Sequence, residues 1–306
     1  MNFKEEILRL KKEKNAVILC HNYINRDVQE VADYLGDSYG LSVKAKETEA
    51  DIIVFAGVRF MAETAKILNP SKKVILSNIE AGCPMADMVN AQDIINEKKK
   101  TDDDLYVATY VNSSAEVKAE SDVCLTSGNA LKVIKNIPSS VKNILFVPDK
   151  NLGRYVEKIS GRSLILWDGY CCVHQDLKPE QIDKIRAKDS NALIIVHPEC
   201  RLDVIEKADM ALSTAGMAKF VRENQDKNIY LGTEPGIVAR MIAEGYDVRP
   251  VDENMICKNM KKTTLQDIYY DLLEERNQIV LPAELMNKAR NSLEKMIEFT
   301  ELDKQI

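Results

Sequence analysis

Apolar and polar segments follow one another in the same order three times along this chain. Each round opens with a short, mainly apolar run that ends in polar residues, at 16–20 before His21, 105–109 before Tyr110 and 192–196 before His197. A short helical stretch and a turn of small polar residues follow, at 32–38, 121–129 and 208–216. Because repeats determine architecture, this pattern predicts three similar structural units.

Two further apolar runs follow in each round. The second runs lie at 52–57, 144–148 and 229–233, and the third at 74–76, 164–166 and 248–251. Continuous apolar runs that are flanked by Gly or Pro and alternate with amphipathic helices are typical of parallel strands covered on both faces. The sequence therefore predicts an α/β protein of three three-layer α/β/α units, with parallel sheets around a pseudo-threefold axis.

The repeat period also predicts the domain limits. The expected units are residues 1–86, 87–173 and 174–263. Residues 3–14 form an amphipathic first helix, and residues 264–306 supply C-terminal helices, one of them opened by Pro282. We expect these C-terminal helices to pack with the first helix or on the first unit.

Composition and charge exclude several classes of protein. The chain has 306 residues and a net charge of −6, with positive and negative residues interspersed, so nucleic-acid binding is not expected. No apolar stretch approaches the roughly 20 residues of a membrane helix, and the charged start at residues 1–6 is unlike a signal peptide. We expect a cytoplasmic protein.

Three of the seven cysteines occupy equivalent places in the repeat. Cys83, Cys171 and Cys257 are 88 and 86 residues apart, and each follows the third strand of its unit in a polar loop. An odd number of cysteines without an export signal favours metal or catalytic thiols over a disulfide framework. Cys20 and Cys124 lie inside apolar runs and are expected to be ordinary core residues.

Three thiolates from three units suit an iron-sulfur cluster. A cluster with three Cys ligands leaves one iron free to bind a substrate oxygen as a Lewis acid. A zinc site with three Cys is the main alternative, although structural zinc usually uses closely spaced C-x-x-C pairs, which this chain lacks. The cysteine spacing by itself leaves both metals open.

Candidate acid-base groups lie near the strand ends. The chain has three histidines, and His21, His174 and His197 all fall in the polar segments near the expected strand ends. Histidine changes charge near neutral pH, and burial could raise the pKa of a carboxylate such as Glu199 toward that range.

A receptor for anions is expected beside these groups. Ser38, Ser127 and Thr214 lie in small-residue turns just before expected helices, where free N–H groups and the helix dipole attract carboxylate or phosphate. Any one of them alone would be an ordinary helix cap. Their occurrence in all three units favours a shared anion pocket, whose wall Tyr110 and Asn112 would complete.

An ordered set of motifs resembles the quinolinate synthase family, iron-sulfur enzymes of NAD biosynthesis. The motifs lie at residues 21–23, 36–38, 82–86, 110–113, 126–130, 148–153, 171–175, 197–200, 213–214, 232–234 and 257–263. The resemblance covers nearly the whole chain. It implies the same triangular fold of three α/β/α domains.

The resemblance also implies a chemistry and roles for residues. The family implies a transferase-type condensation of iminoaspartate with dihydroxyacetone phosphate, which yields quinolinate, phosphate and two waters. One 4Fe-4S cluster would be held by Cys83, Cys171 and Cys257; the usual register selects Cys171 over the adjacent Cys172. Tyr23, Glu199, His21 and Tyr110 are the implied catalytic residues. The implied substrate-binding residues are His21, Ser38, Tyr110, Asn112, Ser127, His174, His197, Glu199, Ser213 and Thr214. An L-aspartate oxidase or dehydrogenase is a candidate for transient contact, since iminoaspartate is unstable.

Two alternatives of other classes stay open. An iron-sulfur hydro-lyase acting on a small hydroxy acid would explain the cluster and the anion pocket, but not the ordered motifs. A cluster or zinc protein that senses iron, oxygen or redox state would need a DNA-binding or partner module, and the sequence contains no basic helix or appended domain of that kind. Fold class alone does not decide among them.

Overall fold

The computed structural model, which describes residues 2–101 and 104–302, contains three four-stranded parallel sheets. In sheet order, the first consists of β2 (Tyr34–Gly36), β1 (Ala16–His21), β3 (Ile52–Ala56) and β4 (Lys73–Leu76). The second consists of β6 (Val123–Leu125), β5 (Tyr106–Tyr110), β7 (Ile144–Val147) and β8 (Ile165–Leu166). The third consists of β10 (Met210–Ala211), β9 (Leu193–Val196), β11 (Ile229–Gly232) and β12 (Val248–Pro250). The identical strand order confirms the three similar α/β units.

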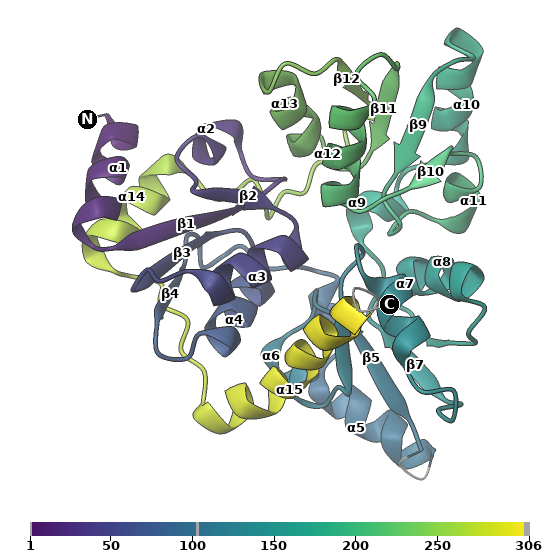
Figure 1. Cartoon of the computed structure of the whole chain (residues 1–306), viewed down its shortest axis with the longest axis horizontal. Helices are drawn as coiled ribbons and strands as arrows, with labels where there is room; N and C mark the ends of the chain where they lie inside the picture. The colour runs from purple at the N-terminus through teal and green to yellow at the C-terminus, as the bar shows by residue number, and fades with distance from the viewer. Residues whose placement is uncertain (1, 102–103, 303–306) are drawn as a thin grey trace.

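Helices flank each sheet, and the units surround a common centre (Figure 1). The first unit has α1 (Phe3–Glu13), α2 (Arg26–Gln29), α3 (Ser38–Glu47) and α4 (Arg59–Leu68). A 3₁₀ turn, η1 (Ala86–Met88), leads to α5 (Ala91–Lys100), α6 (Ala115–Ala119), α7 (Ala130–Asn136) and α8 (Lys150–Ser160) around the second sheet. Around the third lie α9 (Cys172–Gln175), α10 (Pro179–Lys188), α11 (Leu202–Ile205), α12 (Thr214–Glu223) and α13 (Gly236–Ala243).

Each sheet has one strand more than the sequence predicted. The additional strands β2, β6 and β10 are two or three residues long and lie at the sheet edge, within the segments expected to form a short helix and a turn. So short a strand carries no hydrophobic periodicity, because a period of two needs several residues to be visible. The sequence therefore located the segments and missed their pairing.

The same side-chain hydrogen bond recurs in all three units. An aspartate that follows the first short helix accepts the backbone N–H of a central-strand residue 15 positions earlier, with a separation of 2.7 Å each time. The pairs are Asp33 with Ile18, Asp122 with Val107 and Asp209 with Ile194. Charge-assisted bonds to a partly buried N–H are stronger than neutral ones, so this carboxylate holds the edge segment onto the central strand.

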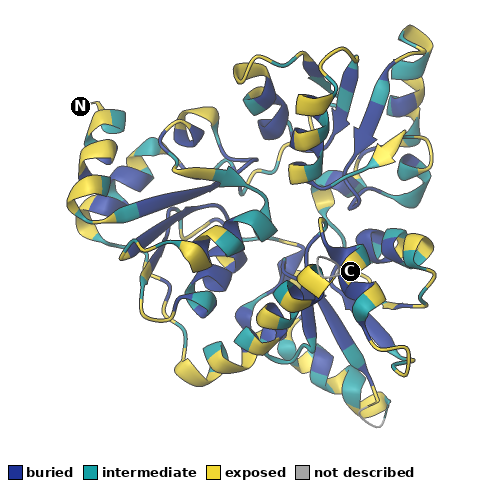
Figure 2. Cartoon of the chain, in the orientation of Figure 1, coloured by how far each residue is buried: buried dark blue, intermediate teal, exposed yellow. Residues whose placement is uncertain are grey.

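The interior of each unit consists of its strands and the inner faces of its helices (Figure 2). All five residues of β3 and all four of β7 are buried. One large apolar cluster joins the first two units and extends into the third, and smaller clusters complete the second and third units. Central strands such as β3 and β7 are buried on both faces, as parallel sheets covered by helices require.

Two C-terminal helices follow the third unit in sequence. α14 (Leu265–Glu274) lies against α1 and β3 of the first unit. α15 (Ala283–Glu301) also touches α4 of the first unit, but its main contacts are with α6 and β6 of the second. This helix lies across the first two units (Figure 1). The unit limits themselves stay a prediction.

None of the helices in the described part of the chain combines the length and the apolar composition that a membrane span requires.

Candidate active site

A single pocket receives the carboxyl ends of the central strands of all three sheets. β1 ends at His21 and β5 at Tyr110, and His197 directly follows β9. Tyr23, Asn112 and Glu199, two residues further along in each unit, line the same pocket. Ligands of parallel α/β sheets bind outside the carboxyl ends of the strands. The repeat thus places six polar or aromatic side chains in a ligand position.

The structure brings nearly all predicted site residues to this pocket. Those that line it are His21, Tyr23, Ser38, Cys83, Tyr110, Asn112, Ser127, Cys171, His174, His197, Glu199, Thr214 and Cys257. Ser213 is the exception, because its hydroxyl caps α12 by accepting the N–H of Gly216 at 3.3 Å. Ser38 and Thr214 are the first residues of α3 and α12, whereas Ser127 lies three residues before α7.

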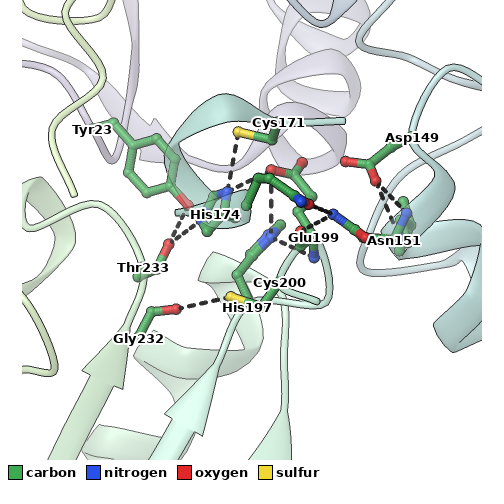
Figure 3. A network of polar contacts seen from close by, with 12 residues as sticks. Tyr23, Asp149, Asn151, Cys171, His174, His197, Glu199, Cys200, Gly232 and Thr233 are labelled. Atoms are coloured by element: carbon green, nitrogen blue, oxygen red, sulfur yellow. Dashed lines mark hydrogen bonds and ion pairs between the residues drawn. The ribbon is translucent and has the colours of Figure 1, made fainter. Parts of the chain in front are cut away.

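Glu199 is the centre of a buried polar network (Figure 3). Its Oε1 accepts the hydroxyl of Tyr110 at 2.5 Å, and its Oε2 lies 2.7 Å from Nδ1 of His174. Burial alone would raise the pKa of Glu199, but the hydrogen bonds that it accepts from His174 and Tyr110 oppose burial, and that pKa lies well below its usual value. The expectation that burial would bring this carboxyl toward neutral titration was wrong, because imidazoles and a phenol surround it.

Two of the histidines are neutral hydrogen-bond donors. Burial lowers the pKa of His21 and of His197 to about 3. The backbone N–H of Tyr23 donates to Nδ1 of His21 at 3.2 Å, and the N–H of Glu199 donates to Nδ1 of His197 at 3.3 Å. Each neutral ring therefore carries its proton on Nε2. Both offer an N–H, and neither changes charge near neutral pH, contrary to the expectation from the residue type.

Tyr23 and His174 share a partner in the third unit. The hydroxyl of Thr233 lies 2.6 Å from the Tyr23 hydroxyl and 2.9 Å from Nε2 of His174. Burial raises the pKa of Tyr23 well above its usual value, and the charge of Glu199 adds to the effect. Tyr23 therefore keeps its proton, as a group that donates a proton or a hydrogen bond must.

Cys83, Cys171 and Cys257 are free, half-buried thiols in the pocket wall. Burial raises the pKa of Cys83 to about 12, and the nearby Cys257 adds to the increase. Burial also raises the pKa of Cys171, to which the charges of Glu199 and Cys83 contribute. Clustered thiols of this kind become thiolates when a cation binds them, because its charge offsets burial and mutual repulsion.

The spread of these thiols bears on the kind of metal they could hold. Within residues 2–101 and 104–302, one group of three Cys, His, Asp or Glu donors has all its ligand atoms within 4.8 Å, namely Cys171, His174 and Glu199. The three thiols do not form such a group, so one ion could not contact all of them as they stand. A cluster of several irons is larger than a single ion, and the three-thiol set fits it better.

The chain is similar to known proteins over nearly all of its length. Residues 5–298 match the model of the family described as quinolinate synthetase A protein. The chain belongs to this family.

Relatives named quinolinate synthase support the assignment. The chain is 46% identical over 298 residues to that of Caldicellulosiruptor bescii, covering 96% of this chain and 97% of the relative. It is 45% identical over 303 residues to that of Alkaliphilus metalliredigens, covering 97% and 98%. It is 45% identical over 294 residues to that of Desulforudis audaxviator, covering 95% and 96%.

Sequence reasoning assigned no role to several residues of the site in this member of the quinolinate synthetase A family. Thr233 joins Tyr23 to His174, and Glu234 lines the pocket with Oε1 2.9 Å from Nζ of Lys261. Both lie in a motif that carried the resemblance, at residues 232–234. Their side-chain partners come from other segments of the chain, so periodicity could not reveal them.

The motif at residues 148–153 holds the backbone of Glu199 in place. Nδ2 of Asn151 donates to the backbone oxygen of Glu199 at 3.2 Å and to Oε1 of Gln175 at 2.7 Å. The buried Asp149 carboxylate accepts the N–H groups of Asn151 and Leu152 (Figure 3). Burial, with the charge of Glu199, raises the pKa of Asp149. This segment of the second unit orients the acidic residue of the third.

Proposed function

We propose that this protein is a quinolinate synthase of NAD biosynthesis. It condenses iminoaspartate with dihydroxyacetone phosphate and releases quinolinate, phosphate and two waters, a balance that needs no oxidant or reductant. Membership of the quinolinate synthetase A family over residues 5–298 carries the proposal. The pocket between the three units supports it, because imidazole, hydroxyl and amide side chains line it and can hydrogen-bond the oxygen atoms of two small anions.

Cys83, Cys171 and Cys257 would hold a 4Fe-4S cluster. When bound, such a cluster would supply a Lewis-acidic iron without a protein ligand. The wide spacing of the three thiols and their raised pKa values support this set, since both call for a large cationic group.

The remaining pocket residues would bind and orient the anions. His21 and His197 would each donate an Nε2–H to a carboxylate or phosphate oxygen, because their Nδ1 atoms already accept backbone N–H groups. Ser38 and Thr214, at the starts of α3 and α12, would add hydroxyl and backbone donors at the positive ends of two helix dipoles. Asn112 and Ser127 would complete the wall from the second unit.

Proton transfer would fall to Glu199 and Tyr23. Glu199 is ionised and hydrogen-bonded to Tyr110 and His174, so it is placed to accept a proton during the dehydrations. Tyr23 retains its proton and lies against Thr233, so it is placed to donate one. Tyr110 would stabilise the ionised form of Glu199 through the 2.5 Å hydrogen bond.

The test is quinolinate formation by anaerobically reconstituted protein, supplied with dihydroxyacetone phosphate and freshly generated iminoaspartate. We expect product that disappears after exposure to air. Protein that carries about four irons per chain and makes no quinolinate would overturn the proposal and favour a hydro-lyase. Cys83→Ser, Cys171→Ser and Cys257→Ser should each lower iron content, and a full cluster in any of them would remove that residue from the ligand set.

A further inference from the structure

We propose that the cluster-free chain binds a single zinc ion at Cys171, His174 and Glu199. This site shares one thiol with the expected cluster and otherwise uses different donors. The inference concerns the chain before its cluster is inserted, so it holds whatever reaction the pocket performs. Its consequence is that zinc and the cluster compete for Cys171, and that zinc immobilises Glu199.

The ligand atoms of the three donors all lie within 4.8 Å of one another. Nδ1 of His174 lies 3.2 Å from Sγ of Cys171 and 2.7 Å from Oε2 of Glu199. The usual bond lengths and tetrahedral angles of zinc set these separations at about 3.5 Å and about 3.4 Å. The ion would fit if Nδ1 of His174 moved about 0.3 Å further from Cys171 and about 0.7 Å further from Glu199. Sulfur, imidazole nitrogen and carboxylate oxygen are the ligand types that zinc uses.

Other contacts hold these ligands in place (Figure 3). Nε2 of His174 contacts Thr233, which leaves Nδ1 for the ion. Oε1 of Glu199 accepts the Tyr110 hydroxyl, which leaves Oε2 free of that bond. Asn151 binds the backbone oxygen of Glu199. Partners of this kind fix ring orientation and carboxylate position in metal sites.

The charge balance also favours a divalent ion. The Cys171 thiolate and the Glu199 carboxylate would together neutralise Zn²⁺, with the thiol proton released to solvent. His174 is 1% exposed and Glu199 is 4% exposed, so a site with no net charge avoids the cost of burying an unpaired charge. Three protein ligands leave the fourth position to a water from the pocket.

Cys83 and Cys257 distinguish this site from a three-cysteine site. Both thiols line the same pocket, but neither belongs to the group whose ligand atoms lie within 4.8 Å. A zinc ion at the proposed site would therefore have one sulfur ligand. A zinc ion that drew the three cysteines together would have three.

The experiment uses full-length cluster-free protein, kept reduced under anaerobic conditions and titrated with Zn²⁺ against a chromophoric chelator. We expect one tightly bound ion per chain. X-ray absorption should then give one sulfur and three nitrogen or oxygen ligands, and Co²⁺ should give a tetrahedral spectrum with a weak thiolate charge-transfer band. Three sulfur ligands, or no stoichiometric binding, would overturn the proposal.

Serine variants of the three cysteines supply matched controls. Cys171→Ser should weaken zinc binding by more than about 100-fold, because changes to residues that only support a ligand already cost 10–100-fold. Cys83→Ser and Cys257→Ser, the same chemical change in the same pocket, should leave zinc affinity within about two-fold while they abolish cluster assembly. Equal losses in all three variants would assign zinc to the cysteines instead.

Two further measurements separate a lost ligand from misfolding and from the proposed reaction. Thr233→Ala leaves all three ligands in place and should weaken zinc binding by about ten-fold, while circular dichroism matches that of the parent protein. Unchanged affinity in this variant would contradict the support assigned to Thr233. Quinolinate formation is measured separately on reconstituted protein, so failure of the zinc site leaves the proposed function untouched.

Discussion

The second and third units place different chemistry on the same scaffold position. Strand pairing aligns Thr109 with Val147 in one and Val196 with Gly232 in the other, so the next residues, Tyr110 and His197, are equivalent. Two positions further, the second unit presents a neutral Asn112 and the third presents Glu199. The third unit therefore brings the charge into the pocket, and the second brings groups that hydrogen-bond to it.

This difference separates what holds the scaffold together from what the pocket does. The aspartate bond to the central strand recurs at 2.7 Å in each unit, because each must hold the same edge segment. The residues at the strand ends differ, because each unit faces a different part of one asymmetric pocket. For the strands and their edge segments, a contact that repeats thus marks the scaffold, whereas departure from the repeat at a strand end marks candidate chemistry.

The largest expected effect comes from removing the charge of the third unit. Glu199→Gln should lower kcat for quinolinate formation by about 10²–10⁴-fold, the usual contribution of a general acid or base. Iron content should stay at the parental level. The matched change in the second unit, Asn112→Ala, should cost about ten-fold, as expected for the loss of one hydrogen bond. Equal losses in the two variants would contradict the division of roles.

A smaller loss of turnover is expected when the hydrogen bond from Tyr110 to Glu199, which joins the two units, is removed. Tyr110→Phe removes the hydroxyl that donates to Glu199 at 2.5 Å. Because a hydrogen bond to a charged group contributes about 1.5–3 kcal/mol, turnover should fall about 10–100-fold. The readout is kcat together with the iron content of reconstituted protein. Unchanged turnover would remove Tyr110 from the site.

The residues at the equivalent strand ends of the two units should also contribute differently to the pH dependence of the unfolding free energy. Burial lowers the pKa of His197 to about 3, against about 6.5 in the unfolded chain. Between these values the unfolded state binds more protons, so His197 costs stability as pH falls through 6.5 toward 3.

A variant of each unit tests this acid response. From pH 6.5 to 5.5, His197→Gln should lose about 1 kcal/mol less unfolding free energy than the parent protein does. Urea unfolding at the two pH values measures the difference. Tyr110→Phe, at the equivalent position, should keep the parental pH dependence, and a flattened one would contradict the assignment to His197.

The smallest difference is expected where the units are alike. Asp122→Ala and Asp209→Ala each remove the bond to the central strand and should each lower the midpoint of thermal unfolding by about 2–4 °C. Asp209→Ala should cost slightly more, because Asp209 also lies 2.7 Å from Arg186 in a partly exposed ion pair that contributes well under 1 kcal/mol. A large disparity in calorimetry would show that the scaffolds are not equivalent.

Local pattern sufficed for much of the fold. The apolar runs located three strands of each sheet, because buried parallel strands are continuous in apolar residues. The edge strands β2, β6 and β10 were missed, since two or three residues give no period. The sequence does not determine which units α15 contacts, because an amphipathic face specifies burial and not the surface that covers it.

The sequence likewise predicted some properties of the candidate site and not others. The repeat and the motifs named the residues that the pocket brings together, because equivalent strand ends and loops meet at one centre. Their protonation was misjudged from residue type: His21 is neutral and Glu199 ionised near neutral pH, which depends on neighbours from other units. Thr233 went unassigned because its partners, Tyr23 and His174, are far from it in sequence.

The sequence by itself determined the three-unit α/β architecture and the residues at its strand ends. Both follow from periodicity and from a repeat of 86–88 residues, which are properties of the chain read in order. The tertiary structure alone decided the distances between Cys171, His174 and Glu199, the spread of the three thiols and the charge on each group. These depend on desolvation and on contacts between units, which arise when the chain folds.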